Sequence, residues 1–262
     1  MPVKPVTPLP AATVVLLRDA SPGVEVLLMQ RHRASKFAGG DFVFPGGKIE
    51  VDDNPDDAAA WCEGLDPDRA AARIGLAGDR RTALGFWIGA IRETFEEVGV
   101  LLAYDATGGW ARIDHPRFAE YQAAVNADNT AFWTMVKTER LKLATDRLAY
   151  FAHWITPEGN PLRFDTRFFA APMPTEQTPT GDDKEVTDLR WLAPAEALDA
   201  QQRGEISLRN PTIRNLMLFT DAASAADALA RLRGRTVRTI APRVVFGPDG
   251  ARRILMPGDP EY

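Results

Sequence analysis

Two apolar runs rich in valine and leucine stand near the start of the chain, at residues 12–17 and 24–30. Ser21-Pro22-Gly23 lies between them and is typical of a tight turn, so the pattern predicts a β-hairpin. A shorter apolar run at residues 42–44 stops at Pro45-Gly46-Gly47. We therefore expect a short strand there that ends in a sharp glycine turn.

The clearest helical period covers residues 82–98, for which Thr82 is the predicted N-cap. An alanine-rich stretch at residues 58–74 predicts another helix, interrupted near Gly64. Within the long helix, the apolar positions that recur at intervals of three and four residues are Leu84, Trp87, Ile88, Ile91, Phe95 and Val98.

The rest of the chain alternates irregularly between the two kinds of element, which predicts an α/β (α+β) fold with a mixed β-sheet sandwiched between helices. The predicted strands are 100–103, 149–155, 167–171 and 186–192, and residues 236–246 and 252–256 form a predicted terminal hairpin. The predicted helices are 118–125, 130–143, 194–201, 211–219 and 222–232.

Composition narrows the class of protein. The chain has 262 residues, more than the roughly 150 of a typical compact domain. The surplus residues must therefore form insertions, extensions or a further domain. A net charge of −5 argues against a nucleic-acid binder, which needs clustered Lys and Arg. Cys62 is the only cysteine, which excludes an internal disulfide and suits the cytoplasm. The N-terminus is unlike a signal peptide, and no apolar stretch is long enough to span a membrane.

Three acids, Glu93, Glu96 and Glu97, stand at i, i+3 and i+4 in the long predicted helix. This spacing places their carboxylates on one face, and Arg92 lies four residues before Glu96, where it can orient that acid. Close carboxylates repel one another unless a cation lies between them, and hard oxygen ligands favour Mg²⁺ or Mn²⁺. The alternative is an acidic helix face that only contacts solvent. The preceding glycine turn argues against this alternative, because glycines let the backbone approach a metal or phosphate closely.

Together these segments resemble the Nudix box, G-x5-E-x7-R-E-U-x-E-E-x-G-U, where U is apolar. Residues 92–100 match its second half apart from Thr94 at the first U, and Gly47 opens its first half, with Asp53 at the position of the first Glu. The 38 residues from Asn54 to Ile91 stand where the family pattern has seven. The chain therefore resembles the Nudix subfamily with an interrupted box, which includes a peroxisomal coenzyme A and acyl-coenzyme A diphosphatase of mammals.

The likeness extends beyond the box, over roughly residues 11–200, through segments 11–15, 154–157 and 163–169. A second partial motif resembles coenzyme A diphosphatases of another Nudix branch. Its basic positions correspond to Arg31 and Lys36, and Arg33 adds a further charge before the catalytic turn. Cations there complement the phosphates of coenzyme A, although exposed loop residues would give the same pattern.

The resemblance implies a role for each of these residues. Glu96 and Glu97 are implied metal ligands, Glu93 is a ligand or the general base, and Arg92 orients the acids. Gly47 is expected to offer a carbonyl to the metal, and Gly46, Arg31, Arg33 and Lys36 are expected to contact substrate. A distal base is sought among Asp182, Asp183 and Glu185, while the three histidines are assigned to no metal.

The implied enzyme is a Nudix hydrolase that splits coenzyme A or an acyl-coenzyme A into 3′,5′-ADP and (acyl-)4′-phosphopantetheine. The alternatives are another nucleoside diphosphate derivative, such as a nucleotide sugar or a dinucleotide, or a silent nucleotide-sensing domain. We expect a small-molecule partner, no nucleic acid and no membrane, and leave a homodimer open. Residues 11–220 form the expected Nudix domain, with insertions at about 54–83 and 108–143 that border the site, and residues 221–262 add a helix and hairpin packed on the same domain.

Overall fold

The computed structural model describes residues 6–35, 38–181, 186–247 and 251–262. Of the residues singled out above, Lys36, Asp182, Asp183 and Glu185 lie outside these ranges. Within them, no helix is long and apolar enough to cross a membrane.

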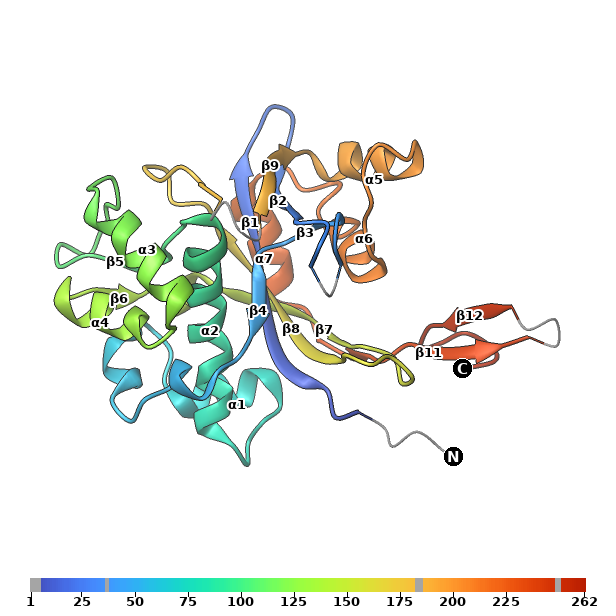
Figure 1. Cartoon of the computed structure of the whole chain (residues 1–262), viewed down its shortest axis with the longest axis horizontal. Helices are drawn as coiled ribbons and strands as arrows, with labels where there is room; N and C mark the ends of the chain where they lie inside the picture. The colour runs from blue at the N-terminus through green and yellow to red at the C-terminus, as the bar shows by residue number, and fades with distance from the viewer. Residues whose placement is uncertain (1–5, 36–37, 182–185, 248–250) are drawn as a thin grey trace.

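A mixed sheet of eight strands forms the centre of the molecule (Figure 1). Its middle strand is β1 (Leu9–Asp19), which pairs antiparallel with β2 (Val24–Arg31) and β4 (Gly46–Lys48) and parallel with β8 (Phe164–Pro172). The predicted N-terminal hairpin is therefore confirmed. The other strands of the sheet are β3 (Phe42–Val43), β7 (Ala149–Ile155), β9 (Val186–Leu192) and β10 (Thr239–Ile240).

Helices cover both faces of this sheet. Alternate residues of β1 point to opposite faces and therefore pack in two separate cores. Val14 and Leu16 pack in one core with four helices, and Val15 and Leu17 pack in another with three. The first set of helices is α1 (Pro67–Ile74), α2 (Arg80–Val98), α3 (Arg117–Ala127) and α4 (Ala131–Thr138). The second set is α5 (Pro194–Gln202), α6 (Asn210–Leu216) and α7 (Ala225–Arg233). The predicted sandwich of a mixed sheet between helices is confirmed.

The long helix α2 begins two residues earlier than the sequence predicts. Asp79 is its N-cap, with a side chain that accepts a hydrogen bond from the backbone N–H of Thr82, so the prediction of Thr82 as the cap was wrong. The helix ends at Gly99, whose left-handed backbone (φ 64°) favours glycine. Its buried face is anchored by Trp87, whose ring lies 4.9 Å from that of Phe169 in β8.

The two predicted insertions are less regular than expected. The stretch 58–74 divides into a 3-10 turn at Ala58–Trp61 and the separate helix α1. The predicted strand 100–103 is reduced to β5 (Ala103–Tyr104). The predicted helix 130–143 is wrong after α4, because Arg140 adopts a positive φ of 52° and β6 (Lys142–Leu143) pairs with β5.

The C-terminal segment leaves the body of the molecule in stages. Helix α7 packs against β7 and β8, and β10 then pairs with β7 in parallel. The chain continues into the hairpin of β11 (Arg243–Phe246) and β12 (Arg252–Leu255), which extends away from the sheet in Figure 1. We refer to the described residues 241–247 and 251–262 as the C-terminal arm.

Candidate active site

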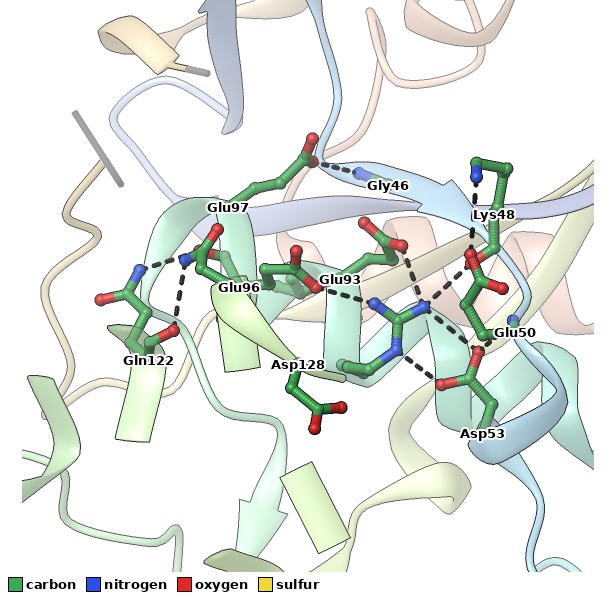
Figure 2. A network of polar contacts seen from close by, with 12 residues as sticks. Gly46, Lys48, Glu50, Asp53, Glu93, Glu96, Glu97, Gln122 and Asp128 are labelled. Carbon is green, nitrogen blue, oxygen red and sulfur yellow. Dashed lines mark hydrogen bonds and ion pairs between the residues drawn. The ribbon is translucent and has the colours of Figure 1, made fainter. Parts of the chain in front are cut away.

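The prediction of a glycine turn at Gly46-Gly47 was wrong, because these residues form the short strand β4, which pairs with β1. This strand and the acidic face of α2 meet directly. Glu97 accepts a hydrogen bond at Oε2 from the backbone N–H of Gly46 in β4, at 2.7 Å (Figure 2). Its other oxygen, Oε1, lies 3.2 Å from Nη1 of Arg31. Glu97 is only 5% exposed, so a backbone amide and a guanidinium compensate its buried charge. The two halves of the interrupted box are thus brought together where β4 lies against α2.

Arg92 is the centre of the acidic cluster. It donates from Nε to Asp53 Oδ1 at 2.6 Å and from Nη1 to Glu96 Oε2 at 2.8 Å. Its Nη2 lies 2.9 Å from Glu93 Oε1 and also donates to the carbonyl of Lys48 at 2.9 Å. Arg92 is 3% exposed, and its guanidinium contacts the carboxylates of Asp53, Glu93 and Glu96 together (Figure 2).

Asp53, at the position of the first Glu of the box, lies beneath Arg92 rather than at the front of the site. Its Oδ2 also accepts a hydrogen bond from the backbone N–H of Glu50 at 2.8 Å. Gly89 of α2 makes room for it, since a Cβ there would lie 2.8 Å from Asp53 Oδ2 and 2.6 Å from Ile49 Cδ1. The shorter acid thus positions Arg92, and the close approach to α2 depends on a glycine.

Glu93 is electrostatically unlike its neighbours. Burial is the largest cause of the rise in its pKa to about 7. The positive charge of Arg92 lowers this pKa, and the negative charges of Glu96 and Asp53 raise it further. Gly47 lies against this carboxyl, since a Cβ at Gly47 would be 2.5 Å from Glu93 Oε2. A cation placed beside Glu93 would stabilise its ionised form.

The donor chemistry of this cluster fits a hard divalent cation. Glu93, Glu96 and Glu97 offer carboxylate oxygens, which are the ligands that Mg²⁺ and Mn²⁺ prefer. Among the described residues, however, no three acidic, histidine or cysteine side chains already converge on one point. The three acids are instead bound to Arg92, Arg31 and the amide of Gly46. A carboxylate that accepts such a contact still has oxygen lone pairs that can coordinate a metal.

The cluster opens into a cleft of about 1100 Å³. Every predicted site residue on β4 and α2 lines it, and so does Arg31, whereas the exposed Arg33 does not. The lining residues among the predictions are Arg31, Gly46, Gly47, Arg92, Glu93, Glu96 and Glu97.

Helix α3 of the second insertion supports α2, and the sequence pattern did not reveal this contact. The carbonyl of Glu96, in the last turn of α2, accepts hydrogen bonds from Gln122 Nε2 at 3.0 Å and Asn126 Nδ2 at 3.2 Å. Residues 125–129 line the cleft, whereas no described residue of 54–83 does. The expectation that both insertions border the site is therefore met by the second alone.

Cys62 lies in the first insertion, away from the lining of the cleft. Burial raises the pKa of its thiol to about 12, so the thiolate that would act as a nucleophile is scarce at neutral pH.

A mixed sheet between helices, with an R-E-x2-E-E helix that meets a glycine-containing strand over a cleft, defines a Nudix hydrolase. The chain belongs to the NUDT19 Nudix domain family, whose model matches residues 81–218, more than half of the chain. It is also similar to a solved structure, the NUDIX hydrolase from Alicyclobacillus acidocaldarius. That similarity has 26% identity and a TM-score of 0.71 over 86% of this chain and 96% of the other.

Curated relatives carry the same family name. The acyl-coenzyme A diphosphatase NUDT19 of Xenopus laevis is 28% identical over 73% of this chain. The Homo sapiens protein of the same name is 29% identical over 92% of this chain. The chain spans 58% of the length of the frog protein and 72% of the human one.

Proposed function

We propose that this protein is a diphosphatase that hydrolyses coenzyme A or acyl-coenzyme A to 3′,5′-ADP and (acyl-)4′-phosphopantetheine. The observation that carries the proposal is the position of Glu93, Glu96 and Glu97 beside Arg31 in one cleft. Acids suited to a divalent cation and a guanidinium suited to phosphate oxygens thus line the same surface. The names of the relatives support coenzyme A esters as the substrate class.

In this proposal Glu96 and Glu97 hold Mg²⁺ or Mn²⁺, with Glu93 as a further ligand or as the general base, and Gly47 offers a backbone carbonyl. The cation, when bound, neutralises phosphate charge and lowers the pKa of a coordinated water. Arg31, which lines the cleft beside Glu97, would bind a phosphate oxygen of the diphosphate. Arg92 acts on the acids rather than on the substrate, because it is buried beneath them.

A product assay tests the proposal. The protein is incubated with Mg²⁺ or Mn²⁺ and a panel of coenzyme A, acyl-coenzyme A, nucleotide sugars and dinucleotides, and products are resolved by anion-exchange chromatography. We expect 3′,5′-ADP from coenzyme A or its esters and none in EDTA. Preferential turnover of a nucleotide sugar or dinucleotide would contradict the substrate, and no turnover with binding alone would indicate a nucleotide sensor.

Three further proposals rest on composition or on family likeness alone. A cytoplasmic location agrees with the single, unreactive cysteine. The net charge of −5 agrees with a small-molecule substrate and no nucleic acid. A homodimer is the third proposal, and light scattering in solution tests it.

A further inference from the structure

One row of residues crosses the sheet from β4, beside the acid cluster, to β10, which leads into the C-terminal arm. Lys48 of β4 pairs with Ala11 of β1, Ala11 with Thr166 of β8, Thr166 with Trp154 of β7, and Trp154 with Ile240 of β10. Residues opposite one another on paired strands share a face. The first four of them line the cleft, which therefore follows this row away from the acids.

The far part of the cleft differs chemically from the acid cluster. Its walls are the aromatic side chains of Trp154, Phe164 and Phe168 from the sheet, together with Pro242 and Ile254 from the C-terminal arm. Ile254 is 38% exposed, so its aliphatic side chain is accessible at the edge of the cleft. Trp154 is 4% exposed, and its indole N–H has no hydrogen-bond partner among the described residues. A ligand with apolar surface and a carbonyl oxygen would suit both features.

The length of the row fits one part of the proposed substrate. Adjacent strands lie about 4.8 Å apart, so β7 is roughly 14 Å from β4. The pantetheine arm of coenzyme A has roughly twelve main-chain atoms, equivalent to about four extended peptide residues and therefore about 14 Å long. With the diphosphate at Gly46 and Gly47, an extended arm would bring the thioester to Trp154 and the acyl chain to the C-terminal arm. The two amide carbonyls of pantetheine and the thioester carbonyl are acceptors for the indole N–H.

The walls of this groove are held in place by buried polar contacts. Arg163 donates to the carbonyls of Thr156, at 3.0 Å, and Val6, at 2.7 Å, which fixes the turn between β7 and β8. His153 contacts Asp165 of β8 with one ring nitrogen and Thr239 Oγ1 of β10 with the other, the latter at 2.8 Å. Strand β10, which leads into the C-terminal arm, is thus tied to β7 beside Trp154.

We propose, on the basis of the proposed function, that this groove binds the pantetheine and acyl parts of an acyl-coenzyme A. The C-terminal arm then determines acyl preference through Ile254. The proposal assigns a specificity role to residues outside the acid cluster. It also gives a use to the aromatic segment 163–169, which the catalytic site leaves unexplained.

Kinetics with acyl chains of increasing length test the groove. For the unaltered protein, kcat/KM is expected to rise from free coenzyme A to medium-chain esters. Ile254→Ser is expected to lower the ratio of kcat/KM for octanoyl-coenzyme A to that for coenzyme A roughly fivefold to tenfold, through lost apolar contact. The matched control is Phe246→Ser, because Phe246 lies on the same hairpin, is 71% exposed and does not line the cleft. This control is expected to keep the ratio.

A second variant tests the indole. Trp154→Phe keeps an aromatic ring but removes the N–H donor, and we expect KM for coenzyme A and its esters to rise about threefold to tenfold while kcat changes little. Equal melting temperatures of the three variants exclude unfolding as the cause. An unchanged ratio in Ile254→Ser, or an unchanged KM in Trp154→Phe, would overturn the assignment of that residue.

Calorimetry in EDTA separates this inference from the reaction itself. If no coenzyme A ester is hydrolysed, yet octanoyl-coenzyme A binds more tightly than coenzyme A and Ile254→Ser loses the difference, the groove stands and the proposed reaction fails. If 3′,5′-ADP is formed, yet neither affinity nor turnover depends on the acyl chain, the reaction stands and the groove fails.

Discussion

Asp53 and Arg92 are 39 residues apart in the chain and form a bidentate ion pair, with Nε to Oδ1 at 2.6 Å and Nη2 to Oδ2 at 3.2 Å. Both side chains are almost fully buried. The pair ties the end of the first half of the box to the catalytic helix across the inserted segment. It also explains how an aspartate can stand where the family pattern has a glutamate, because Arg92 reaches down to it.

Asp53→Asn is expected to lower kcat about 10- to 100-fold, since Arg92 loses the charge that holds it beneath Glu93 and Glu96. Loss of the charge-assisted hydrogen bonds is expected to lower the free energy of unfolding by about 1.5–3 kcal/mol. The product assay measures kcat, and urea unfolding measures the free energy of unfolding. Asp56→Asn is the matched control, because Asp56 is exposed, and it is expected to change stability by less than about 0.5 kcal/mol. Equal effects of the two substitutions would argue against a positioning role for Asp53.

Two helical glycines, one turn apart in α2, give a matched test of the packing beneath the site. Gly89→Ala would place a Cβ 2.6 Å from Ile49 Cδ1, and overpacking is expected to cost about 1–3 kcal/mol of unfolding free energy. Gly85→Ala meets its nearest atoms, in Asn54 and Ile49, at 3.6 Å, an ordinary contact distance. Because alanine favours a helix, this change is expected to be neutral or to stabilise by up to about 1 kcal/mol. Urea unfolding measures both, and the reverse order would contradict the described contact of residues 49–53 with α2.

Gly47→Ala is expected to reduce kcat/KM about 10- to 100-fold with little change in melting temperature. Its Cβ would meet the flexible end of Glu93 rather than the backbone, so the carboxyl moves and the fold does not. Gly78→Ala is the control, because a Cβ there meets nothing within 4 Å. Full activity of Gly47→Ala would show that the position of Glu93 against β4 is not required.

Cys62 is expected to react slowly with thiol reagents in the native protein. A pKa raised from 9.0 to about 12 disfavours the thiolate, so at about pH 8 its fraction falls roughly 1000-fold relative to an ordinary thiol. Labelling with a disulfide reagent is followed with and without guanidinium chloride. Rapid labelling of the folded protein would show that Cys62 is exposed and reactive.

Much of the site could be predicted because it depends on local spacing. The i, i+3 and i+4 acids of α2 needed only helical geometry. Gly46 and Gly47 were predicted as a turn, whereas pairing with β1 makes them part of β4. The N-cap was misplaced because Asp79 and Thr82 are both good caps, and it is the Asp79 side chain that accepts the hydrogen bond from the N–H of Thr82. The predicted helix 130–143 failed after Thr138 because pairing of β6 with β5 overrides local propensity.

Long-range contacts account for what the pattern did not reveal. The amides of Gln122 and Asn126 hold the carbonyl of Glu96 from 26 and 30 residues away. The row from Lys48 to Trp154 depends on strand order, because β8 lies between β1 and β7. Neither leaves a periodic signal in the chain.

The central claim is that the acids of α2 form the catalytic metal site. The most direct measurement is the rate of 3′,5′-ADP formation from coenzyme A at saturating Mg²⁺ or Mn²⁺ for Glu97→Gln, beside Glu50→Gln. Glu50 lines the same cleft but lies outside the acid cluster and pairs with Lys48 on the surface. We predict that Glu97→Gln loses activity about 100-fold or more, because a charged oxygen ligand is removed, and that Glu50→Gln stays within about threefold of the unaltered protein. Equal turnover by Glu97→Gln and the unaltered protein would contradict the account.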